Sequence, residues 1–93
     1  MLFRSVKLKV NASQANYIRD LKLHDSQEEI ERNEEYSIFR YWLRPQFDFI
    51  QELLWNGGDM EVLEPKELRE EMAEIVESMW NKYHREEKQN GKW

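Results

Sequence analysis

The chain has 93 residues, 40% of them hydrophobic and 13% aromatic, which suits one small domain with a modest core. It contains no cysteine, which excludes disulfides and thiolate metal sites. Its 19 acidic and 14 basic residues give a net charge of -5 without a strong basic cluster, which disfavours direct binding to double-stranded DNA. Apolar runs are far shorter than the ~20 residues that span a bilayer, and the N-terminus has no signal-peptide pattern. We therefore expect a soluble, cytoplasmic domain that makes no membrane contact.

Alternating hydrophobicity predicts a first strand over residues 3–10, with one inward face. Asn11 and Gln14 have the spacing of a capping box, which predicts a short helix from there to about Leu23. Its apolar stripe comprises Ala15, Ile18 and Leu21.

A hairpin is predicted next. Residues 26–32 are polar, and we expect them to form an exposed strand in which Ile30 faces the core. Residues 33–35 form the turn, and the aromatic-rich segment 36–43 forms the partner strand. Pro45 ends that strand because it has no N–H to donate to the ladder.

The second half of the chain is helical except for one short strand. Residues 47–55 have helical spacing, with a stripe of Phe47, Ile50 and Leu54, and Gly57 is expected at the left-handed cap. A strand over 60–63 follows, and Pro65 suits the start of a long helix. The stripe of that helix, the strongest periodic signal in the chain, comprises Leu68, Met72, Ile75, Met79 and Tyr83.

This order predicts an α+β fold: a ferredoxin-like βαββαβ antiparallel sheet with helices on one face, plus a long C-terminal helix. We expect residues 1–84 to form one domain and residues 85–93 a frayed tail. The last helix must bury its stripe against the sheet or against a neighbouring molecule.

Catalytic patterns are missing from the sequence. His24 and His84 have no metal-ligand spacing, and Asp25 beside His24 is best interpreted as a loop cap. The carboxylates of the last helix fit a solvated face, and Gly57-Gly58 lacks the surroundings of a phosphate loop. We expect no enzyme activity, no catalytic or metal residues, and no cofactor.

Large side chains fall on both faces of the strand 36–43. An alternative to protein contact is therefore a ligand site, with arginines to bind anions and aromatic rings to stack on bases. The ligand-binding candidates are Arg40, Tyr41, Trp42 and Arg44, and the candidate interface residues are Ile38, Trp42 and Trp80. An RNA-binding sheet is a weaker interpretation because its motifs are missing and the charge is unfavourable.

Residues 22–83 contain a series of short segments in a characteristic order: His24-Asp25-Ser26-Gln27, Leu43-Arg44-Pro45, Phe47-Asp48-Phe49, Leu53-Leu54, Asn56-Gly57, Met60 to Pro65, and Leu68-Arg69-Glu70-Glu71. On these segments, residues 22–83 resemble the C-terminal extension, often called WCX, that follows the WYL domain in many bacterial transcription regulators. The strand and helix before them fit the usual start of the extension.

The resemblance implies a parent protein with a separate DNA-binding domain and a ligand-sensing WYL domain. It implies that this segment helps to form a homodimer or to complete the sensing region. We therefore expect its partners to be its own WYL domain and a second copy of the chain. The alternative is a direct ligand- or nucleotide-binding sensor.

Overall fold

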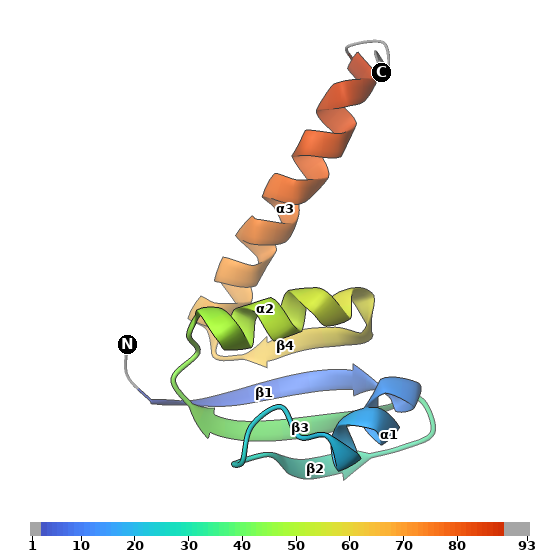
Figure 1. The fold of residues 1–93 in the computed structure, drawn as a ribbon, viewed down its shortest axis with the longest axis vertical. Coiled ribbons are helices and arrows are strands. Elements are labelled where there is room, and N and C mark those ends of the chain that lie inside the picture. Colours follow the sequence, from blue (N-terminus) through green and yellow to red (C-terminus); the bar gives the residue numbers. More distant parts are fainter. Residues whose placement is uncertain (1–2, 89–93) are drawn as a thin grey trace.

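A computed structural model describes residues 3–88, with side-chain surroundings given for residues 3–84. The described residues form four strands, three α-helices and one short 3-10 helix. Their arrangement is shown in Figure 1. The elements are β1 (Arg4–Asn11), α1 (Ala12–Asp20), β2 (Glu28–Arg32), β3 (Tyr36–Leu43), α2 (Phe47–Asn56), η1 (Gly57–Asp59), β4 (Met60–Glu64) and α3 (Lys66–Lys88).

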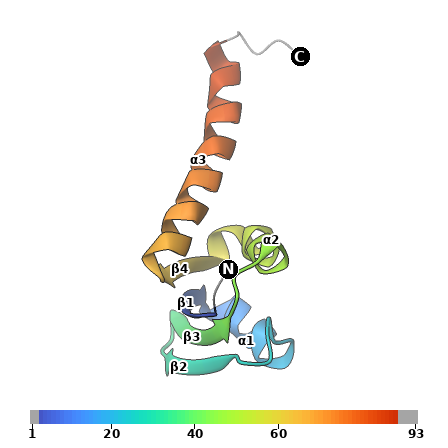
Figure 2. The ribbon, with the colours of Figure 1, turned by 90° about the vertical axis from the view of Figure 1, so that its left-hand side faces the viewer.

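The strands form one antiparallel sheet in the order β2-β3-β1-β4. Because every neighbouring pair is antiparallel, α1 joins two parallel strands with β3 between them, and α2 joins two with β1 between them. Figure 2 shows both helices on the same side of the sheet, with α3 rising beyond the β4 edge. The predicted antiparallel sheet and C-terminal helix are confirmed. None of the helices in residues 3–88 is long and apolar enough to cross a membrane.

The core lies between the sheet and the helices α1 and α2. The alternation predicted for the strands holds, because the inward residues of β1 and β3 are at most 3% exposed. The buried apolar residues are Val6, Leu8, Val10, Ala15, Ile18, Phe39, Tyr41, Leu43, Phe49, Ile50, Leu53, Val62 and Leu68.

The predicted capping box is wrong. The Asn11 side chain makes no cap hydrogen bond, and its Nδ2 donates to Asp59 instead. Gln14 Nε2 donates to Asn56 Oδ1, 2.6 Å away. The two amides thus hold the start of α1 against η1 and the end of α2. The helix also ends at Asp20 rather than near Leu23, so Leu21 lies beyond it and is 58% exposed.

The second correction concerns β2. We expected Ile30 to face the core, but it is 38% exposed. The register of β2 on β3 shifts between Glu29 and Glu31, so Glu29 takes the position opposite Phe39 on the helix-covered face. An irregularity of one residue therefore moves the apolar side chain out of the core and a carboxylate inward.

The stripe predicted for α2 is partly wrong. Ile50 is buried as predicted, but Phe47 is 71% exposed, and the helix also buries Phe49 and Leu53, which flank the predicted stripe. Its stop is confirmed, because Gly57 has φ +55°.

The last helix extends past residue 84, where we predicted the domain to end. Residues 85–88 of the expected tail belong to α3, and residues 89–93 lie outside the described part.

Candidate interaction surface on the last helix

The first turns of α3 are fixed to the body of the domain. Leu68 is 3% exposed, and Met72 and Ile75 pack partly against the core. Arg69 Nη1 donates to Glu61 Oε2 and to the carbonyl oxygen of Val62, each 2.7 Å away. These contacts hold the start of the helix on β4.

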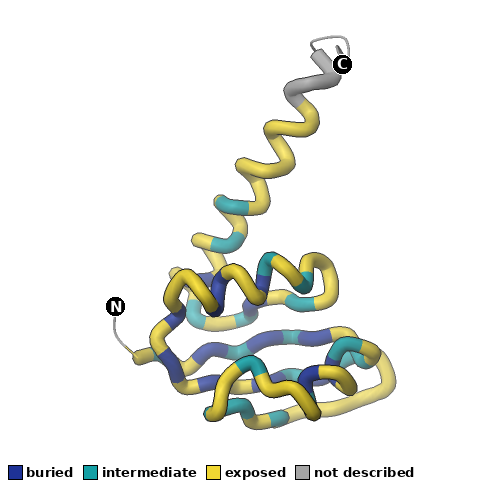
Figure 3. Tube along the Cα trace, in the orientation of Figure 1, coloured by how far each residue is buried: buried dark blue, intermediate teal, exposed yellow. Residues whose placement is uncertain are grey.

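Beyond these turns α3 extends away from the sheet and from α2 (Figures 1 and 2). Figure 3 shows this part of the helix as exposed. Large apolar side chains nevertheless continue along it. We call the following four residues the α3 surface: Val76, 53% exposed, Met79, 49%, Trp80, 57%, and Tyr83, 74%. Exposed apolar side chains gathered on one element are typical of an interaction site.

An apolar groove connects the α3 surface to the core. It has a volume of about 980 Å³ and lies between α3, β4 and the end of α2. Its lining includes Leu54, Gly57, Met60, Met72, Ala73 and Trp80. The glycine and the alanine leave room in the groove, and the methionines can repack against more than one partner surface.

His84 adds a polar end to the α3 surface. Its ring stacks on Trp80 at 3.6 Å between centroids, and its Nδ1 is 2.9 Å from the Trp80 carbonyl oxygen.

The other histidine, His24, lies in the loop after α1. Its Nδ1 is 2.8 Å from Ser26 Oγ and accepts from the Ser26 N–H.

The structure separates the ligand-binding candidates of β3. Arg40 and Trp42 share the open face, whereas Tyr41 is buried on the helix-covered face. Tyr41 donates its hydroxyl hydrogen to Gln27 Oε1, 2.7 Å away, and burial raises the pKa of the phenol. The Arg40 guanidinium is paired with Glu28 at 2.7 Å.

Two of these candidates do lie together at the end of β3. Trp42 is 58% exposed and stacks on Phe3, with the ring centroids 6.0 Å apart. The Arg44 guanidinium lies 5.0 Å from the same phenylalanine ring. Among the interface candidates, Ile38 is half-buried on β3, and Trp80 lies on a different element, α3.

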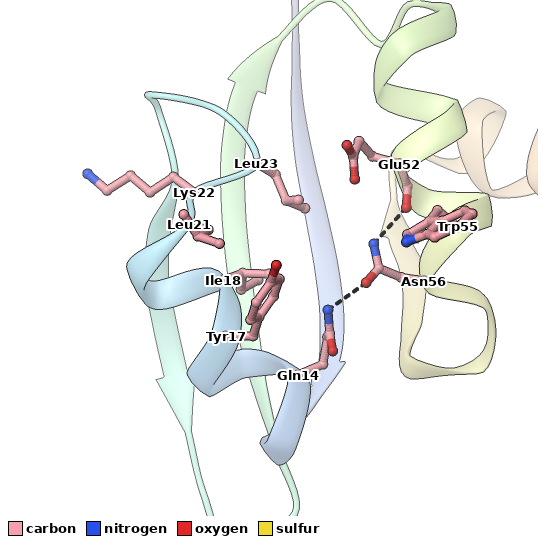
Figure 4. A pocket seen from close by; sticks show the side chains of 9 residues that line it. All are labelled: Gln14, Tyr17, Ile18, Leu21, Lys22, Leu23, Glu52, Trp55 and Asn56. Carbon is pink, nitrogen blue, oxygen red and sulfur yellow. Dashed lines mark hydrogen bonds between the residues drawn. The ribbon is translucent and has the colours of Figure 1, made fainter.

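A cleft between α1 and α2 was missed by the sequence analysis. Figure 4 shows it with the hydrogen bond between Gln14 and Asn56 on one side. Its volume is about 440 Å³, and its lining includes Tyr17 and Trp55, which are 58% and 88% exposed. The only signal in the sequence was that both rings fall beside the apolar stripes of their helices.

The chain also matches a known protein family. The family model described as "WCX domain" matches residues 3–80, which includes every strand, α1, α2 and most of α3. None of the curated proteins matches the chain.

Proposed function

We propose, because the chain belongs to the WCX domain family, that it is an interaction and regulatory module of a bacterial transcription regulator of the WYL type. In this proposal it contributes to dimer formation or effector sensing. It neither reads DNA nor catalyses a reaction, and it acts in the cytoplasm, where such a regulator meets DNA.

We also infer that its fold is the ferredoxin-like arrangement. The support is the element order βαββαβ and the two helices that each join parallel strands across one intervening strand. In this arrangement α3 is an addition to a fold that is already complete, so it is free to serve contact with another molecule.

The observation that carries the proposed function is the exposed α3 surface beside the apolar groove. A helix of 23 residues that uses only its first turns for its own core has a second half available to a partner. That partner is the WYL domain of the same regulator or a second copy of the chain.

The alternative function, direct ligand binding by the sheet, has less support. A ligand on the open face would have to compete with Glu28 for Arg40, and it could not reach the buried Tyr41. Trp42 and Arg44 remain as exposed groups, but Arg44 already lies on the Phe3 ring.

The test is the substitution Trp80→Ser in the regulator and in the isolated chain. We expect weaker assembly of the regulator, measured by sedimentation, with an unchanged denaturant midpoint of the chain at a dilution where it is monomeric. Trp55→Ser is the matched control, because Trp55 is an even more exposed tryptophan that lies on α2, outside the α3 surface.

Loss of stability of the chain, together with normal assembly of the regulator, would contradict the proposed function. Equal effects of the two substitutions on assembly would contradict the role of the α3 surface.

A further inference from the structure

We propose that the occupant of the groove is α3 of a second copy of this chain, packed antiparallel, with the two-fold axis near residues 76 and 77. This inference rests on the proposed function and deepens it by naming the partner and its orientation. Three independent features of α3 support it: its division into two halves, its charge, and the side chains along its edges.

The two halves of α3 complement each other. The groove is lined by α3 residues of both halves, from Arg69 to Trp80, and the second half also carries the exposed side chains of the α3 surface. Antiparallel packing places the second half of each helix in the groove of the other copy. The same patch is then used on both chains, as a two-fold interface requires.

Charge changes sign along the helix. Residues 66–77 carry a net charge of -3, from Lys66, Glu67, Arg69, Glu70, Glu71, Glu74 and Glu77. Residues 78–88 carry a net charge of +1, from Lys82, Arg85, Glu86, Glu87 and Lys88 with His84 neutral. Antiparallel packing sets the acidic half against the basic half, whereas parallel packing sets like against like.

The geometry of the helix also predicts a specific ion pair between the two chains. Glu71 and Lys82 are eleven residues apart, about three turns, so they lie on the same edge of the helix. An antiparallel pair centred between residues 76 and 77 brings Glu71 of one chain beside Lys82 of the second copy. Both side chains are exposed in the single chain.

The other edge places a large side chain against a small one. Ala73 and Trp80 are seven residues apart, about two turns, and both line the groove. The same axis brings Trp80 of each chain over Ala73 of the other. The antiparallel register therefore gives the exposed indole a place to be buried.

Single cysteines test the orientation directly, because the chain has none of its own. Val76→Cys and Tyr83→Cys are a matched pair on the α3 surface of the full 93-residue chain. In the proposed dimer the Cα atoms at position 76 of the two chains lie almost level, within reach of the roughly 5.5–6 Å that a disulfide needs. The Cα atoms at position 83 lie about 20 Å apart along the helices, so the introduced thiols there cannot form a disulfide.

We expect disulfide-linked dimers from Val76→Cys only, under mild oxidation, together with a dimer of the unsubstituted chain in sedimentation. Disulfide formation by both variants would show parallel helices and would overturn the orientation while leaving the proposed function intact. A sedimenting dimer with neither variant linked would overturn both the inference and the role assigned to the α3 surface. A monomer with neither variant linked would overturn the second-copy partner, and the Trp80→Ser test in the regulator would then decide the proposed function separately.

A charge exchange tests the register without cysteines. Lys82→Glu and Glu71→Lys each replace two symmetric attractions by repulsions, so each should weaken dimerisation about fivefold or more. The double variant should restore most of the affinity. Failure of the double variant to recover, with both single variants weakened, would overturn the proposed register.

Discussion

Glu29 is a charged residue on the helix-covered face of the sheet, where a simple pattern would place an apolar side chain. Its carboxylate accepts hydrogen bonds from Arg19 Nε and Nη2, at 2.9 and 2.7 Å, and from Ser37 Oγ at 2.6 Å. The hydrogen bonds from Arg19 are the main cause that lowers the pKa of Glu29 to about 2, and burial opposes them. This network ties α1 to the edge strand β2.

The first prediction is a pH dependence that comes from this carboxylate. The pKa of Glu29 is lower in the folded state than its ordinary value of 4.5, so the stabilisation is complete above pH 4.5 and is lost as the pH falls toward 2. Glu29→Gln should lower the free energy of unfolding by about 1–2 kcal/mol at pH 7. Between pH 4.5 and 2, the free energy of unfolding of this variant should fall less than that of the unsubstituted chain. Urea titrations at pH 7 and 3 measure both.

Glu28→Gln is the control, because Glu28 pairs with Arg40 at the surface and should cost less than about 1 kcal/mol. Two results would contradict the role of the Glu29 carboxylate: a similar cost for both substitutions, or an unchanged loss of stability between pH 4.5 and 2 in Glu29→Gln.

Gly57 supports a second prediction at this scale. With φ at +55°, a β-branched residue there is strained although nothing lies within 4 Å of its added Cβ. Gly57→Val should cost about 1 kcal/mol or more, measured by the denaturant midpoint. Gly58→Val should cost less, since Gly58 has no positive φ and the same open space. Equal costs would show that backbone strain is not the reason for the glycine.

At the scale of elements, β1 and β3 could be predicted from the sequence because their alternation matches the burial of two faces. The bulge in β2 could not, since it depends on the pairing of Glu29 with Arg19 and Ser37 rather than on local pattern. The cap of α1 failed for a similar reason. The side chains of Asn11 and Gln14 bind residues 48 and 42 positions away, which a local motif cannot reveal.

The third prediction concerns the gradient of burial along α3. Leu68→Ala should cost about 2–5 kcal/mol in a dilute chain, because the side chain is in the core. Truncation of the half-buried Ile75 should cost about 1 kcal/mol, and that of the exposed Met79 about 0.5 kcal/mol or less. Chemical denaturation of the three alanine variants checks this order. Equal losses would mean that the second half of α3 packs on its own domain.

At the scale of the whole molecule, two of the cations on the open sheet face are paired with glutamates. Arg40 is paired with Glu28, and Lys7 Nζ lies 3.9 Å from Glu64. Together with the net charge of -5, this leaves little positive surface for a phosphate backbone. The fourth prediction is therefore that the chain does not bind double-stranded DNA measurably at physiological salt. A gel shift that shows tight, salt-sensitive binding would contradict it.

The candidate site was only partly predictable. The periodic stripe of α3 and the aromatic Trp80 are visible in the sequence, but which part of a stripe finds its own core depends on where the helix leaves the sheet. The fixing of Arg69 to β4 directs the second half of α3 away from the body, and no local pattern encodes that direction. The chemistry of the side chains groups Tyr41 with Arg40 and Trp42 as ligand-binding candidates, but the alternation of the strand places Tyr41 on the opposite face.

The central claim is that the second half of α3 is an interaction surface that a partner covers. Amide hydrogen exchange over residues 76–84 tests it most directly, with the dilute chain compared to the assembled regulator. We predict rapid exchange in the dilute chain and exchange at least about tenfold slower after assembly, while the buried strand β1 exchanges slowly in both. Equal exchange of residues 76–84 in the two samples, with assembly verified by sedimentation, would contradict the claim.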